Sequence, residues 1–487
     1  MTALAQVAEK PKPTDEQVEI YDRIRGTADN LLINALAGGG KTTTLEGAMS
    51  YIREPTLYLA FNTSVVKEAE ERQNNGTIPS IVKIDTLNRL GLRCWRDGNG
   101  KANTNPDKPF ELLKAYISDQ VTGYQDRRAA NEAFADILHA TKMAKHLGYI
   151  PEGKYPHARR LCDVHGLNAR LETPLTPFEQ EIVDDVLFTS IQASYAGSVD
   201  FDDQIYMPAL FGGSFPRFPN VLVDEDQDLD PVQHAMLDKV ARGRLCAVGD
   251  RWQAIYHFRG AETGGVDKLK TKFKMQEMPL SYSFRCPENI VKAVHWHVPH
   301  MRWIKTGGTY DVLPTLDPTT IPEGSAIVCR NNAPLFRAAF ALLSRKRSVS
   351  VAGSDIGPKI IKLLGKVGSP RDTSETLIKK IDGWMLEQLE RTNAPASVID
   401  KAECMKVFAT WGSTLDQAIS YAKHIFSQKG TIYLSTGHKA KGMEWDTVYH
   451  LDKQLLGKEE QDLNLRYVIT TRAKKELFEI TTEDMQW

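Results

Sequence analysis

The segment LLINALAGGGKTTTLEGAMSYI, residues 31–52, predicts a strand, a glycine-rich turn and a helix in immediate succession. Its first six residues form a short apolar run of the length of a buried strand, and a helical pattern begins at Lys41. A buried strand that leads directly into a helix is the repeating unit of parallel α/β sheets. The segment therefore indicates an α/β fold.

The turn itself, ALAGGGKT at 35–42, has the composition of a phosphate-binding loop. The glycines at 38–40 let successive backbone N–H groups face phosphate oxygens, and the start of the following helix adds partial positive charge. Lys41 would reach the β- and γ-phosphates of a nucleotide, and Thr42 would ligate Mg²⁺. Ala35 replaces the first glycine of the usual pattern, and an ordinary turn before a helix is the alternative interpretation.

A second part of the same site is predicted at VLVDEDQD, residues 221–228, where an apolar strand ends in acidic residues. Asp224 would coordinate Mg²⁺ directly or through water, and Glu225 would orient and deprotonate the attacking water. Taken alone, these acidic residues could belong to a solvated loop. Together with the phosphate loop they predict a hydrolytic nucleotide site.

Further apolar runs of strand length alternate with helical patterns along the chain. In the first half they lie at 56–61, 81–87 and 244–250, and in the second half at 325–330, 431–436 and 447–452. Such alternation predicts two α/β cores with parallel sheets. Two mostly helical stretches interrupt the cores, and we interpret them as insertions.

The resulting organisation has four parts, listed here by residue number. The first core comprises 1–96 and 198–275, the first insertion 97–197, the second core 276–350 and 431–487, and the smaller second insertion 351–430. The first 13 or so residues, with two prolines, are expected to form a loose tail.

Length and composition limit the class of protein. A chain of 487 residues is expected to form about three domains or subdomains. Hydrophobic residues make up 41% and charged residues 25%, which is typical of a globular protein and excludes a disordered, collagen-like or coiled-coil chain. The 61 basic residues balance 62 acidic ones, so a uniformly basic surface for nucleic acid is excluded, whereas a local basic groove is not.

Membrane insertion, secretion and a cysteine-bound metal receive little support from the sequence. No apolar run approaches the roughly 18–20 residues that span a bilayer. The N-terminal segment lacks the apolar stretch of a signal peptide. None of the six cysteines belongs to a CxxC pair. These features predict an intracellular protein with reduced thiols.

Ten motifs follow one another between residues 13 and 473. In chain order they read PTDEQ, ALAGGGKT, LAFNTSVVKEAEER, DTLNRLG, VDFDDQIYMP, VDEDQD, AVGDRWQAIYHFRGA, LSYSFRCP, STGHKAKGMEW and LRYVITTRA. Their composition and order resemble superfamily-1 DNA helicases of the UvrD/Rep/PcrA group, and are similar to the helicase core of the F-box DNA helicases. The resemblance covers nearly the whole chain, and the two insertions match only by position. It implies two RecA-like phosphate-loop domains with parallel sheets, each with a mostly helical inserted subdomain.

The resemblance also implies a nucleotide site made by both cores. Gln17 would read the adenine through its amide, and Phe284 would stack on the base in place of the family's tyrosine. Arg285 and Arg472 would bring positive charge from the second core to the γ-phosphate. Lys41, Glu225, Gln253, Arg285 and Arg472 form the implied catalytic set. The other implied nucleotide contacts are Ala37, Gly38, Gly39, Gly40, Thr42, Thr43, Gly442 and Glu444. Asp250 could support the metal or cap a helix, and Thr43 could be an ordinary helix residue.

The opposite side of the same motifs is implied to bind single-stranded DNA, by stacking aromatic rings on bases and donating hydrogen bonds to phosphates. The implied residues are Phe61, Asn62, Thr86, Asn88, Tyr256, Phe258, Arg259, Thr436 and His438. Asn88 replaces a histidine of the group. Phe258 replaces a tryptophan, and its smaller ring predicts weaker stacking on the bases of the strand. His438 could instead be a histidine of the core.

The implied function is that of an ATP-dependent DNA helicase that uses ATP and Mg²⁺ to move along single-stranded DNA, 3′ to 5′, and to unwind duplex. Its partners would be single-stranded and tailed duplex DNA, together with replication or repair proteins. We expect a monomer, with assembly on DNA left open, located in the cytoplasm or nucleoid, or in the nucleus of a eukaryote.

Two other functions agree with parts of the sequence. A DNA-stimulated ATPase of the same fold could strip or load partner proteins without processive unwinding, and the small second insertion keeps this alternative open. A nucleotide or small-molecule kinase would share the phosphate loop. The ordered motifs after that loop argue against a kinase, which would show no stimulation by nucleic acid.

Overall fold

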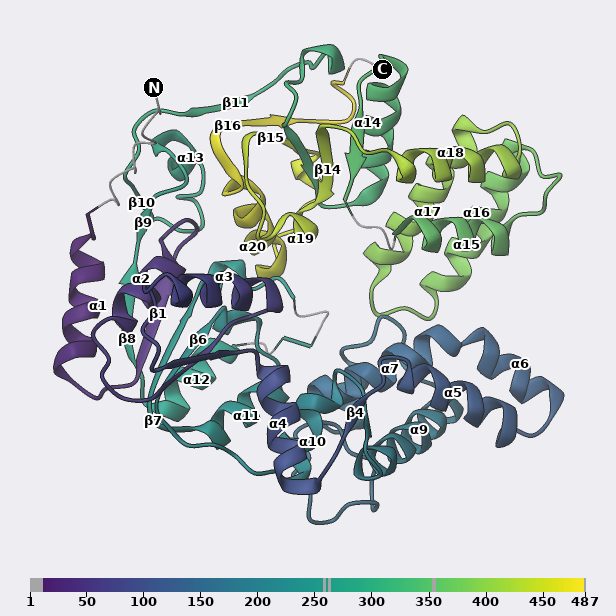
Figure 1. The fold of residues 1–487 in the computed structure, drawn as a ribbon. Coiled ribbons are helices and arrows are strands. Elements are labelled where there is room, and N and C mark those ends of the chain that lie inside the picture. Colours follow the sequence, from purple (N-terminus) through teal and green to yellow (C-terminus); the bar gives the residue numbers. More distant parts are fainter. Residues whose placement is uncertain (1–11, 257–259, 262–263, 353–355, 486–487) are drawn as a thin grey trace, which may run out of the picture.

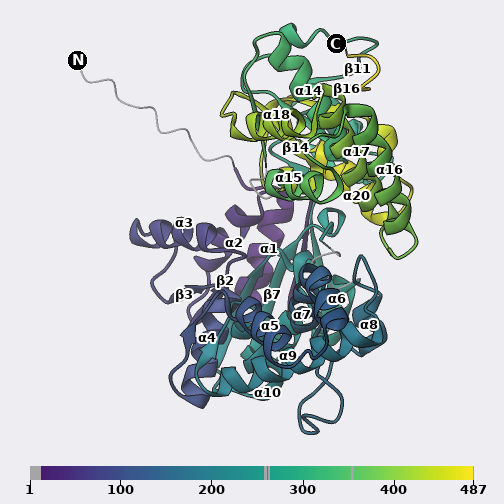
Figure 2. The same cartoon turned by 90° about the vertical axis from the view of Figure 1, so that its right-hand side faces the viewer.

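The computed structural model describes residues 12–256, 260–261, 264–352 and 356–485. Most of the predicted N-terminal tail lies outside these residues. The chain forms two halves, one above the other in Figures 1 and 2. The first core and the first insertion make the lower half, and the second core and the second insertion make the upper half. Each core contains a six-stranded sheet with parallel neighbours, which confirms the predicted α/β fold of two parallel-sheet domains.

The first sheet has the strand order β3-β2-β6-β7-β1-β8. Its strands are β1 (Leu31–Ala35), β2 (Thr56–Leu59), β3 (Val82–Asp85), β6 (Phe218–Asp224), β7 (Ala241–Gly249) and β8 (Gln276–Leu280). β8 lies beyond the predicted boundary at residue 275, and it belongs to the first core because it pairs with β1. The strand that precedes the phosphate loop, β1, lies between β7 and β8, because Leu31 pairs with Cys246 on one side and with Gln276 on the other. The carboxyl ends of β1 and β6 therefore bring the phosphate loop and the acidic motif to one edge of the sheet.

Helices cover both faces of this sheet. They are α1 (Asp15–Gly26), α2 (Lys41–Met49), α3 (Thr63–Asn74), α4 (Leu87–Asn99), α10 (Asp203–Phe211), α11 (Pro231–Val240) and α12 (Gly265–Phe273). Leu31 and Ile33 of β1 pack in one buried cluster with α1, α2 and α3, whereas Leu32 packs on the other face with α4, α10, α11 and α12. Burial of alternate residues on both faces explains why the strands of a parallel sheet appear in the sequence as continuous apolar runs.

The second sheet has the strand order β11-β16-β15-β12-β14-β13. Its strands are β11 (Thr309–Val312), β12 (Ala326–Cys329), β13 (Val349–Val351), β14 (Ile432–Thr436), β15 (Trp445–Leu451) and β16 (Ala473–Ile480). Two short strands, β9 (Tyr282–Ser283) and β10 (Arg302–Trp303), pair where the chain passes from one core to the other. The predicted strands of this half are the three central ones, β12, β14 and β15.

One face of the second sheet is packed toward the first core. The helices of this core are α13 (Glu288–Lys292), α14 (Asn332–Ser344), α19 (Gly437–Ala440) and α20 (Glu460–Thr470). Val328 of β12 and Val468 of α20 belong to one buried cluster that also contains Leu36 and Ala37 of the phosphate loop. The apolar interior is therefore continuous from the second core to the phosphate loop of the first.

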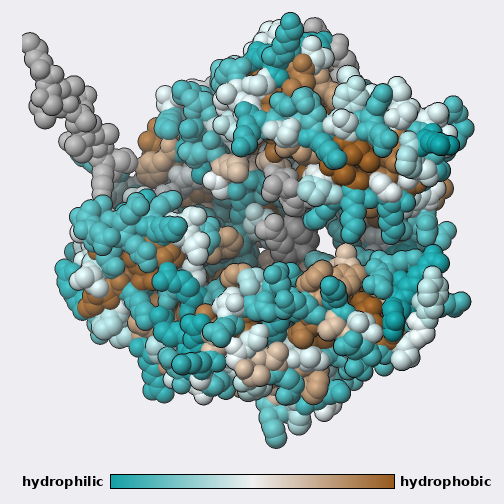
Figure 3. All heavy atoms as spheres, turned by 45° about the vertical axis from the view of Figure 1, so that its right-hand side comes forward, coloured by the Kyte–Doolittle hydropathy of each residue, from teal (hydrophilic) through white to brown (hydrophobic). Residues whose placement is uncertain are grey.

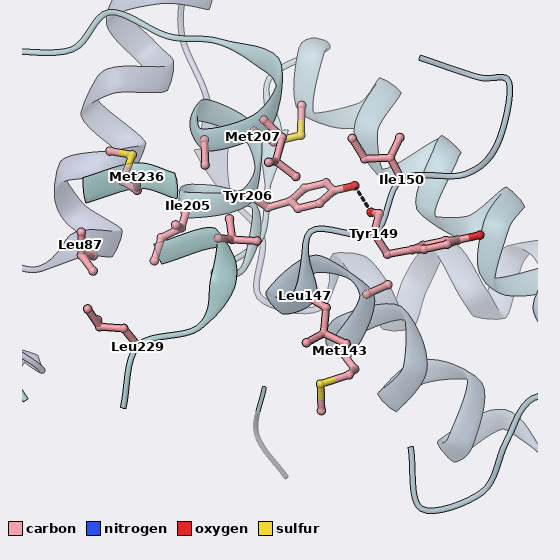
Figure 4. Packing of buried hydrophobic residues seen from close by; sticks show 14 of the residues in the cluster. Leu87, Met143, Leu147, Tyr149, Ile150, Ile205, Tyr206, Met207, Leu229 and Met236 are labelled. Atoms are coloured by element: carbon pink, nitrogen blue, oxygen red, sulfur yellow. Dashed lines mark hydrogen bonds between the residues drawn. The ribbon is translucent and has the colours of Figure 1, made fainter. Parts of the chain in front are cut away.

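The first insertion is helical and packs against α10. Its elements are β4 (Asn103–Thr104), α5 (Lys108–Asp119), α6 (Tyr124–Glu132), α7 (Phe134–Leu147), α8 (Val164–Asn168), α9 (Pro177–Tyr195) and β5 (Ser198–Val199). The chain turns at Ala133, where α6 ends and α7 begins. The hydroxyl of Tyr206 in α10 donates to the carbonyl of Tyr149 at 2.7 Å, amid the apolar residues drawn in Figure 4.

Buried charges also join the first insertion to α10. The Nζ of Lys108 and the Nζ of Lys145 each lie 2.6 Å from a carboxylate oxygen of Asp203. Lys145 also lies 2.5 Å from Asp200. All four side chains are almost fully buried. Because an unpaired charge is strongly unfavourable in such a place, the insertion and the segment before α10 depend on each other.

The second insertion is a bundle of four helices. They are α15 (Ile356–Val367), α16 (Ser374–Leu389), α17 (Pro395–Trp411) and α18 (Leu415–Ser427). The ring of Phe408 in α17 packs at a tilt against that of Phe336 in α14, with the ring centroids 5.2 Å apart. The bundle therefore shares its apolar core with the second core.

The two insertions touch at their tips. The Asn393 side-chain amide donates to the carbonyls of Asn168 and Leu171, each at 3.2 Å, and Lys401 Nζ lies 2.9 Å from Glu172. With the contact between the cores on the other side, this closes a loop of protein around an opening that is visible between the halves in Figure 3.

Three general features complete the description. None of the helices within the described ranges has the length and apolar content of a membrane span. The six cysteines are free thiols. In the part of the chain that the structure describes, no three His, Cys, Asp or Glu side chains gather as a metal centre made of protein ligands alone.

Candidate nucleotide site between the two cores

The phosphate loop adopts a shape that requires glycine. Gly38 and Gly40 have φ angles of 73° and 77°, in the left-handed region that other residues reach only with strain. A Cβ atom at Gly38 would lie 2.5 Å from the Cβ of Arg285 in the second core. The Gly39 N–H donates to the Leu36 carbonyl at 2.8 Å and closes the loop. The glycines therefore set the shape of the loop and also permit the close approach of the second core.

Lys41 and Glu225 form the polar centre of the site. The Lys41 Nζ, at the start of α2, donates to Glu225 Oε2 at 2.6 Å. Glu225 follows directly after β6 and has a φ of 55°, which is uncommon for a residue other than glycine. Asp224, one residue earlier, accepts from the Tyr58 hydroxyl at 3.3 Å. The unusual backbone at Glu225 thus separates the two neighbouring carboxylates into different surroundings.

These surroundings move the pKa values of the two carboxylates in opposite directions. Burial would raise the pKa of Glu225, but the charges of Lys41 and Lys441 outweigh it and lower the pKa to about 2. Burial and repulsion from Glu225 raise the pKa of Asp224 to about 6. Burial would lower the pKa of Lys41, yet the two carboxylates hold it above its ordinary value. Glu225 is therefore ionised at neutral pH, as a group that accepts a proton from water must be.

Thr42 and Asp224 offer the oxygen atoms that were predicted for Mg²⁺. Asp224 is buried, and one of its oxygens accepts from the Glu225 amide at 2.9 Å. Thr42 follows Lys41 in the first turn of α2. Mg²⁺ usually binds through one or two carboxylates together with phosphate oxygens and water. One carboxylate and one hydroxyl beside a phosphate loop therefore fit this ion.

Gln17 and Phe284 approach the loop at Gly40. A Cβ atom at Gly40 would lie 3.4 Å from Gln17 Nε2 and 3.7 Å from the ring of Phe284. The amide of Gln17 accepts from the Thr14 N–H at 3.0 Å and donates to the Thr44 hydroxyl at 2.9 Å. One hydrogen and one lone pair of this amide remain, which suits a two-point contact with adenine. Thr43, by contrast, is exposed on α2.

Arg285 and Arg472 both reach the boundary between the cores. Arg285 Nε donates to Glu444 Oε2 at 2.6 Å, and Arg472 Nη2 donates to Gln253 Oε1 at 3.4 Å. Burial, and then repulsion from Arg285, lower the pKa of Arg472 to about 10. Gly442, with a φ of 85°, stands two residues before Glu444. The structure thus brings Arg472 into contact with Gln253 of the first core and the Cβ of Arg285 against Gly38, while the Arg285 guanidinium bonds within the second core.

Further residues that join the cores were not among the predicted site residues. Lys441 Nζ lies 2.6 Å from Asp228 Oδ2. The Tyr467 hydroxyl accepts from the Ala37 N–H at 2.8 Å and donates to Asp250 Oδ2 at 3.1 Å. Each of these residues lies inside one of the ten motifs, and that position is the signal in the sequence that could have identified it. Their partners belong to other motifs, and only the fold brings them together.

In the first core, the predicted DNA contacts lie at the carboxyl ends of β2 and β3. Phe61 is 47% exposed, and Asn62 accepts a backbone N–H as the cap of α3. Thr86 is buried and caps α4 in the same way, and Asn88 donates to a backbone carbonyl before α10 at 2.8 Å. Phe61 therefore has the accessible ring that stacking on a base requires, while the others already have partners within the protein.

The remaining residues that were predicted to contact DNA lie where the cores meet. The Tyr256 hydroxyl donates to the His438 carbonyl at 3.2 Å, and Lys441 Nζ lies 4.7 Å from the centre of the Tyr256 ring. Thr436 ends β14 and precedes α19. The predicted contacts Phe258 and Arg259 lie outside the described residues.

Two family models match the chain. The model of the UvrD/REP helicase N-terminal domain matches residues 16–274, which is more than half of the chain. The model of the UvrD-like helicase C-terminal domain matches residues 431–478. The first match contains the phosphate loop and the acidic pair, and the second contains Tyr467 and Arg472. These matches confirm the resemblance inferred from the motifs.

Several curated proteins are similar to the chain. F-box DNA helicase protein 1 of Schizosaccharomyces pombe is 23% identical over 517 residues, which cover 95% of this chain and 57% of that protein. ATP-dependent DNA helicase UvrD1 of Mycobacterium leprae is 30% identical over 300 residues, or 54% of this chain and 37% of the relative. DNA helicase II of Escherichia coli is 23% identical over 303 residues, or 56% and 39%. The chain thus spans 37–57% of the length of these relatives.

Proposed function

Because this chain belongs to the UvrD/REP helicase family, we propose that it is an ATP-dependent DNA helicase. It would hydrolyse ATP to move along single-stranded DNA in the 3′-to-5′ direction and to separate the strands of a duplex. The observation that carries the proposal is the meeting of both cores at the phosphate loop, where Arg285 lies against Gly38 and Tyr467 binds Ala37. A nucleotide bound there would touch both cores at once.

Hydrolysis is assigned to Glu225. In the nucleotide-bound protein, Lys41 would contact phosphate oxygens, which releases the Glu225 carboxylate from its ion pair. The carboxylate would then accept a proton from the water that attacks the γ-phosphate. A Mg²⁺ ion bound through Thr42 and Asp224 would offset the negative charge of the β- and γ-phosphates. This assignment is supported by the position of Glu225 directly after β6 and by its 2.6 Å contact with Lys41, which place the carboxylate beside the phosphate loop.

Coupling to movement is assigned to the second core. Arg285 and Arg472 would bind the γ-phosphate oxygens, whose charge a planar guanidinium matches well. Gln253 would sense the same phosphate, because it is bonded to Arg472 on one side and to Asp250 on the other. ATP binding would thus draw the cores together, and hydrolysis would let them separate.

The nucleotide base and sugar would be bound at the rim of this site. Gln17 and Phe284 would hold the adenine, and Gly442 and Glu444 would face the ribose. Single-stranded DNA would bind on the side of these motifs that faces away from the nucleotide. Its bases would stack on the aromatic rings of Phe61 and Tyr256. A protein with this substrate would act in the cytoplasm or nucleoid, or in a nucleus.

The test compares ATP turnover with and without single-stranded DNA, followed by unwinding of 3′-tailed and 5′-tailed duplexes. The proposal predicts DNA-stimulated turnover and unwinding of the 3′-tailed duplex alone. Stimulated turnover without unwinding of either duplex would favour an ATPase that strips or loads partner proteins. Turnover that is indifferent to DNA would reject both functions.

A further inference from the structure

The hydroxyl of Tyr467 stands between the two cores with no contact to solvent. Tyr467 belongs to α20 and its side chain is fully buried. The hydroxyl accepts from the Ala37 N–H at 2.8 Å and donates to Asp250 Oδ2 at 3.1 Å. Burial, together with the charge of Asp250, holds the pKa of Tyr467 well above its usual range. The hydroxyl therefore keeps its proton and remains a donor to the carboxylate.

A second path joins the same carboxylate to the same part of the second core. Gln253 Nε2 donates to Asp250 Oδ2 at 2.6 Å, and Arg472 Nη2 donates to Gln253 Oε1 at 3.4 Å. Tyr467 and Arg472 lie five residues apart, at the end of α20 and just after it. These bonds form one continuous chain. Arg472 of the second core bonds Gln253, Gln253 bonds Asp250 within the first core, and Asp250 bonds Tyr467 of the second core.

The surroundings make these bonds hard to replace with water. Leu36 and Ala37 of the phosphate loop belong to the same buried apolar cluster as Tyr467 and Val468. A buried backbone N–H that loses its hydrogen-bond partner destabilises the protein by the full free energy of its desolvation. The position of the Ala37 amide therefore depends on a hydroxyl from the opposite core.

We infer that Tyr467 is a positioning residue that couples the spacing of the two cores to the phosphate loop. This inference rests on the proposed function. Its hydroxyl holds the Ala37 amide and the Asp250 carboxylate. Through Gln253, that carboxylate is also linked to Arg472. Any change in the distance between the cores must change both hydrogen bonds of this hydroxyl. Tyr467 acts through Ala37 and Asp250 and does not itself contact the nucleotide.

The variant Tyr467→Phe tests this inference, because it removes a single oxygen atom and keeps the ring. Tyr206→Phe is the matched control, since its equally buried hydroxyl donates to a carbonyl far from the site in the fold. Hydrogen–deuterium exchange of the peptide that carries Ala37 is measured in the intact protein without nucleotide. We expect exchange about tenfold faster in Tyr467→Phe and unchanged in Tyr206→Phe. Equal exchange in Tyr467→Phe and the unmodified protein would overturn the inference.

Kinetics then separate positioning from simple structural support. In Tyr467→Phe, kcat for ATP hydrolysis with single-stranded DNA is expected to fall about tenfold, whereas KM for ATP changes less than about twofold. Tyr467→Phe should cause a smaller further loss in an Asp250→Ala background than in the unmodified protein, because the hydrogen bond between the two side chains is already absent there and only the bond to Ala37 remains to be lost. An unchanged kcat, or a loss that Tyr206→Phe matches, would contradict the inference. The exchange experiment needs neither DNA nor turnover, so it is judged independently of the proposed function.

Discussion

At the scale of single residues, Glu225 unites an unusual backbone with an unusual charge state. Its left-handed φ turns the side chain toward Lys41, and its low pKa keeps it ionised. Neither property can be inferred from the letters DE in the sequence. Strain of this kind costs roughly 1–3 kcal/mol and persists where the surrounding structure requires it. Here the surrounding structure is the end of β6 and the phosphate loop.

The first prediction concerns this carboxylate. Glu225→Gln keeps the size of the side chain but cannot accept a proton, so kcat for ATP hydrolysis should fall by about 100-fold or more. ATP binding should remain, because Lys41 and the loop glycines are unchanged. Turnover and binding of a fluorescent ATP analogue check the two parts. Glu288→Gln, in the exposed Glu288–Lys292 pair, is the control, and full turnover by Glu225→Gln would remove the assignment of the base.

A second prediction separates backbone strain from contact at the phosphate loop. Gly38→Ala meets both a left-handed φ and the Cβ of Arg285 at 2.5 Å, whereas Gly153→Ala meets a φ of 71° in open space. Gly153→Ala should lower the free energy of unfolding by about 1 kcal/mol and leave ATP turnover intact. Gly38→Ala should carry a similar backbone strain. It should also lose most ATP turnover, because the added methyl group displaces Arg285. Denaturation curves and steady-state kinetics distinguish the two effects, and equal turnover in both variants would show that the contact is unimportant.

At the scale of elements, the central strands could be predicted and several outer ones could not. The runs at 31–36 and 325–330 are buried on both faces and therefore appear as continuous apolar segments. β8, β11 and β16 have mixed sequences, QEMPL, TYDV and AKKELFEI, because some of their side chains face solvent. Their place in the sheet is set by neighbours that are distant in sequence.

The same distinction holds for the site. Residues that define a motif, such as Lys41 and Glu225, could be identified from local spacing and from the family resemblance. The contacts of Lys441 with Asp228 and of Tyr467 with Ala37 join positions more than 200 residues apart. No local pattern encodes such a pair, so these links between elements required the fold.

The third prediction concerns the buried charges that join the first insertion to α10. Asp203→Asn leaves Lys108 and Lys145 with one charged partner fewer in a place without solvent. We expect the free energy of unfolding to fall by about 3–5 kcal/mol, because an uncompensated buried charge remains. Urea denaturation measures this change. Asp119→Asn at the exposed end of α5 should have almost no effect, and equal stability of the two variants would contradict the role of the cluster.

The fourth prediction concerns pH and the link between α7 and α11. His146 Nδ1 lies 2.7 Å from Asp230, at the start of α11, and its other nitrogen lies 3.4 Å from Asp202. Burial would lower the pKa of His146, but its bonds to these carboxylates raise the pKa from 6.5 to about 10. Because the folded-state pKa is the higher one, the stabilisation is complete below pH 6.5 and is lost as the pH rises to about 10.

The measurement compares unfolding of the unmodified protein and His146→Gln across this range. The imidazole is 36% exposed, so solvent screening reduces the effect to on the order of 1 kcal/mol. The unmodified protein should lose about this much more stability between pH 7 and pH 10 than His146→Gln. Parallel pH profiles for the two proteins would show that His146 is not charged in the folded state.

At the scale of the whole molecule, the contact between the insertions closes the loop of protein around the opening in Figure 3. The fifth prediction is that Lys401→Glu, which places a negative charge beside Glu172, separates the tips of the insertions. The radius of gyration measured by small-angle X-ray scattering should rise. The unfolding temperature should hardly change, because an exposed ion pair contributes less than about 1 kcal/mol. Lys423→Glu on the exposed face of α18 is the control, and an equal radius in both variants would show that the contact does not hold the tips together.

The strand order of the first sheet also has a consequence for biosynthesis. β1 lies between β7 and β8, and the Leu36 amide at the base of the phosphate loop donates to the Leu280 carbonyl at 2.9 Å. A ribosome releases β1 long before either neighbour, since the entire first insertion is translated in between. Until Leu280 has been added, a nascent polypeptide can pair β2 with β3 but cannot complete the sheet around β1. More than half of these 487 residues must therefore be translated before the sheet that supports the phosphate loop is complete.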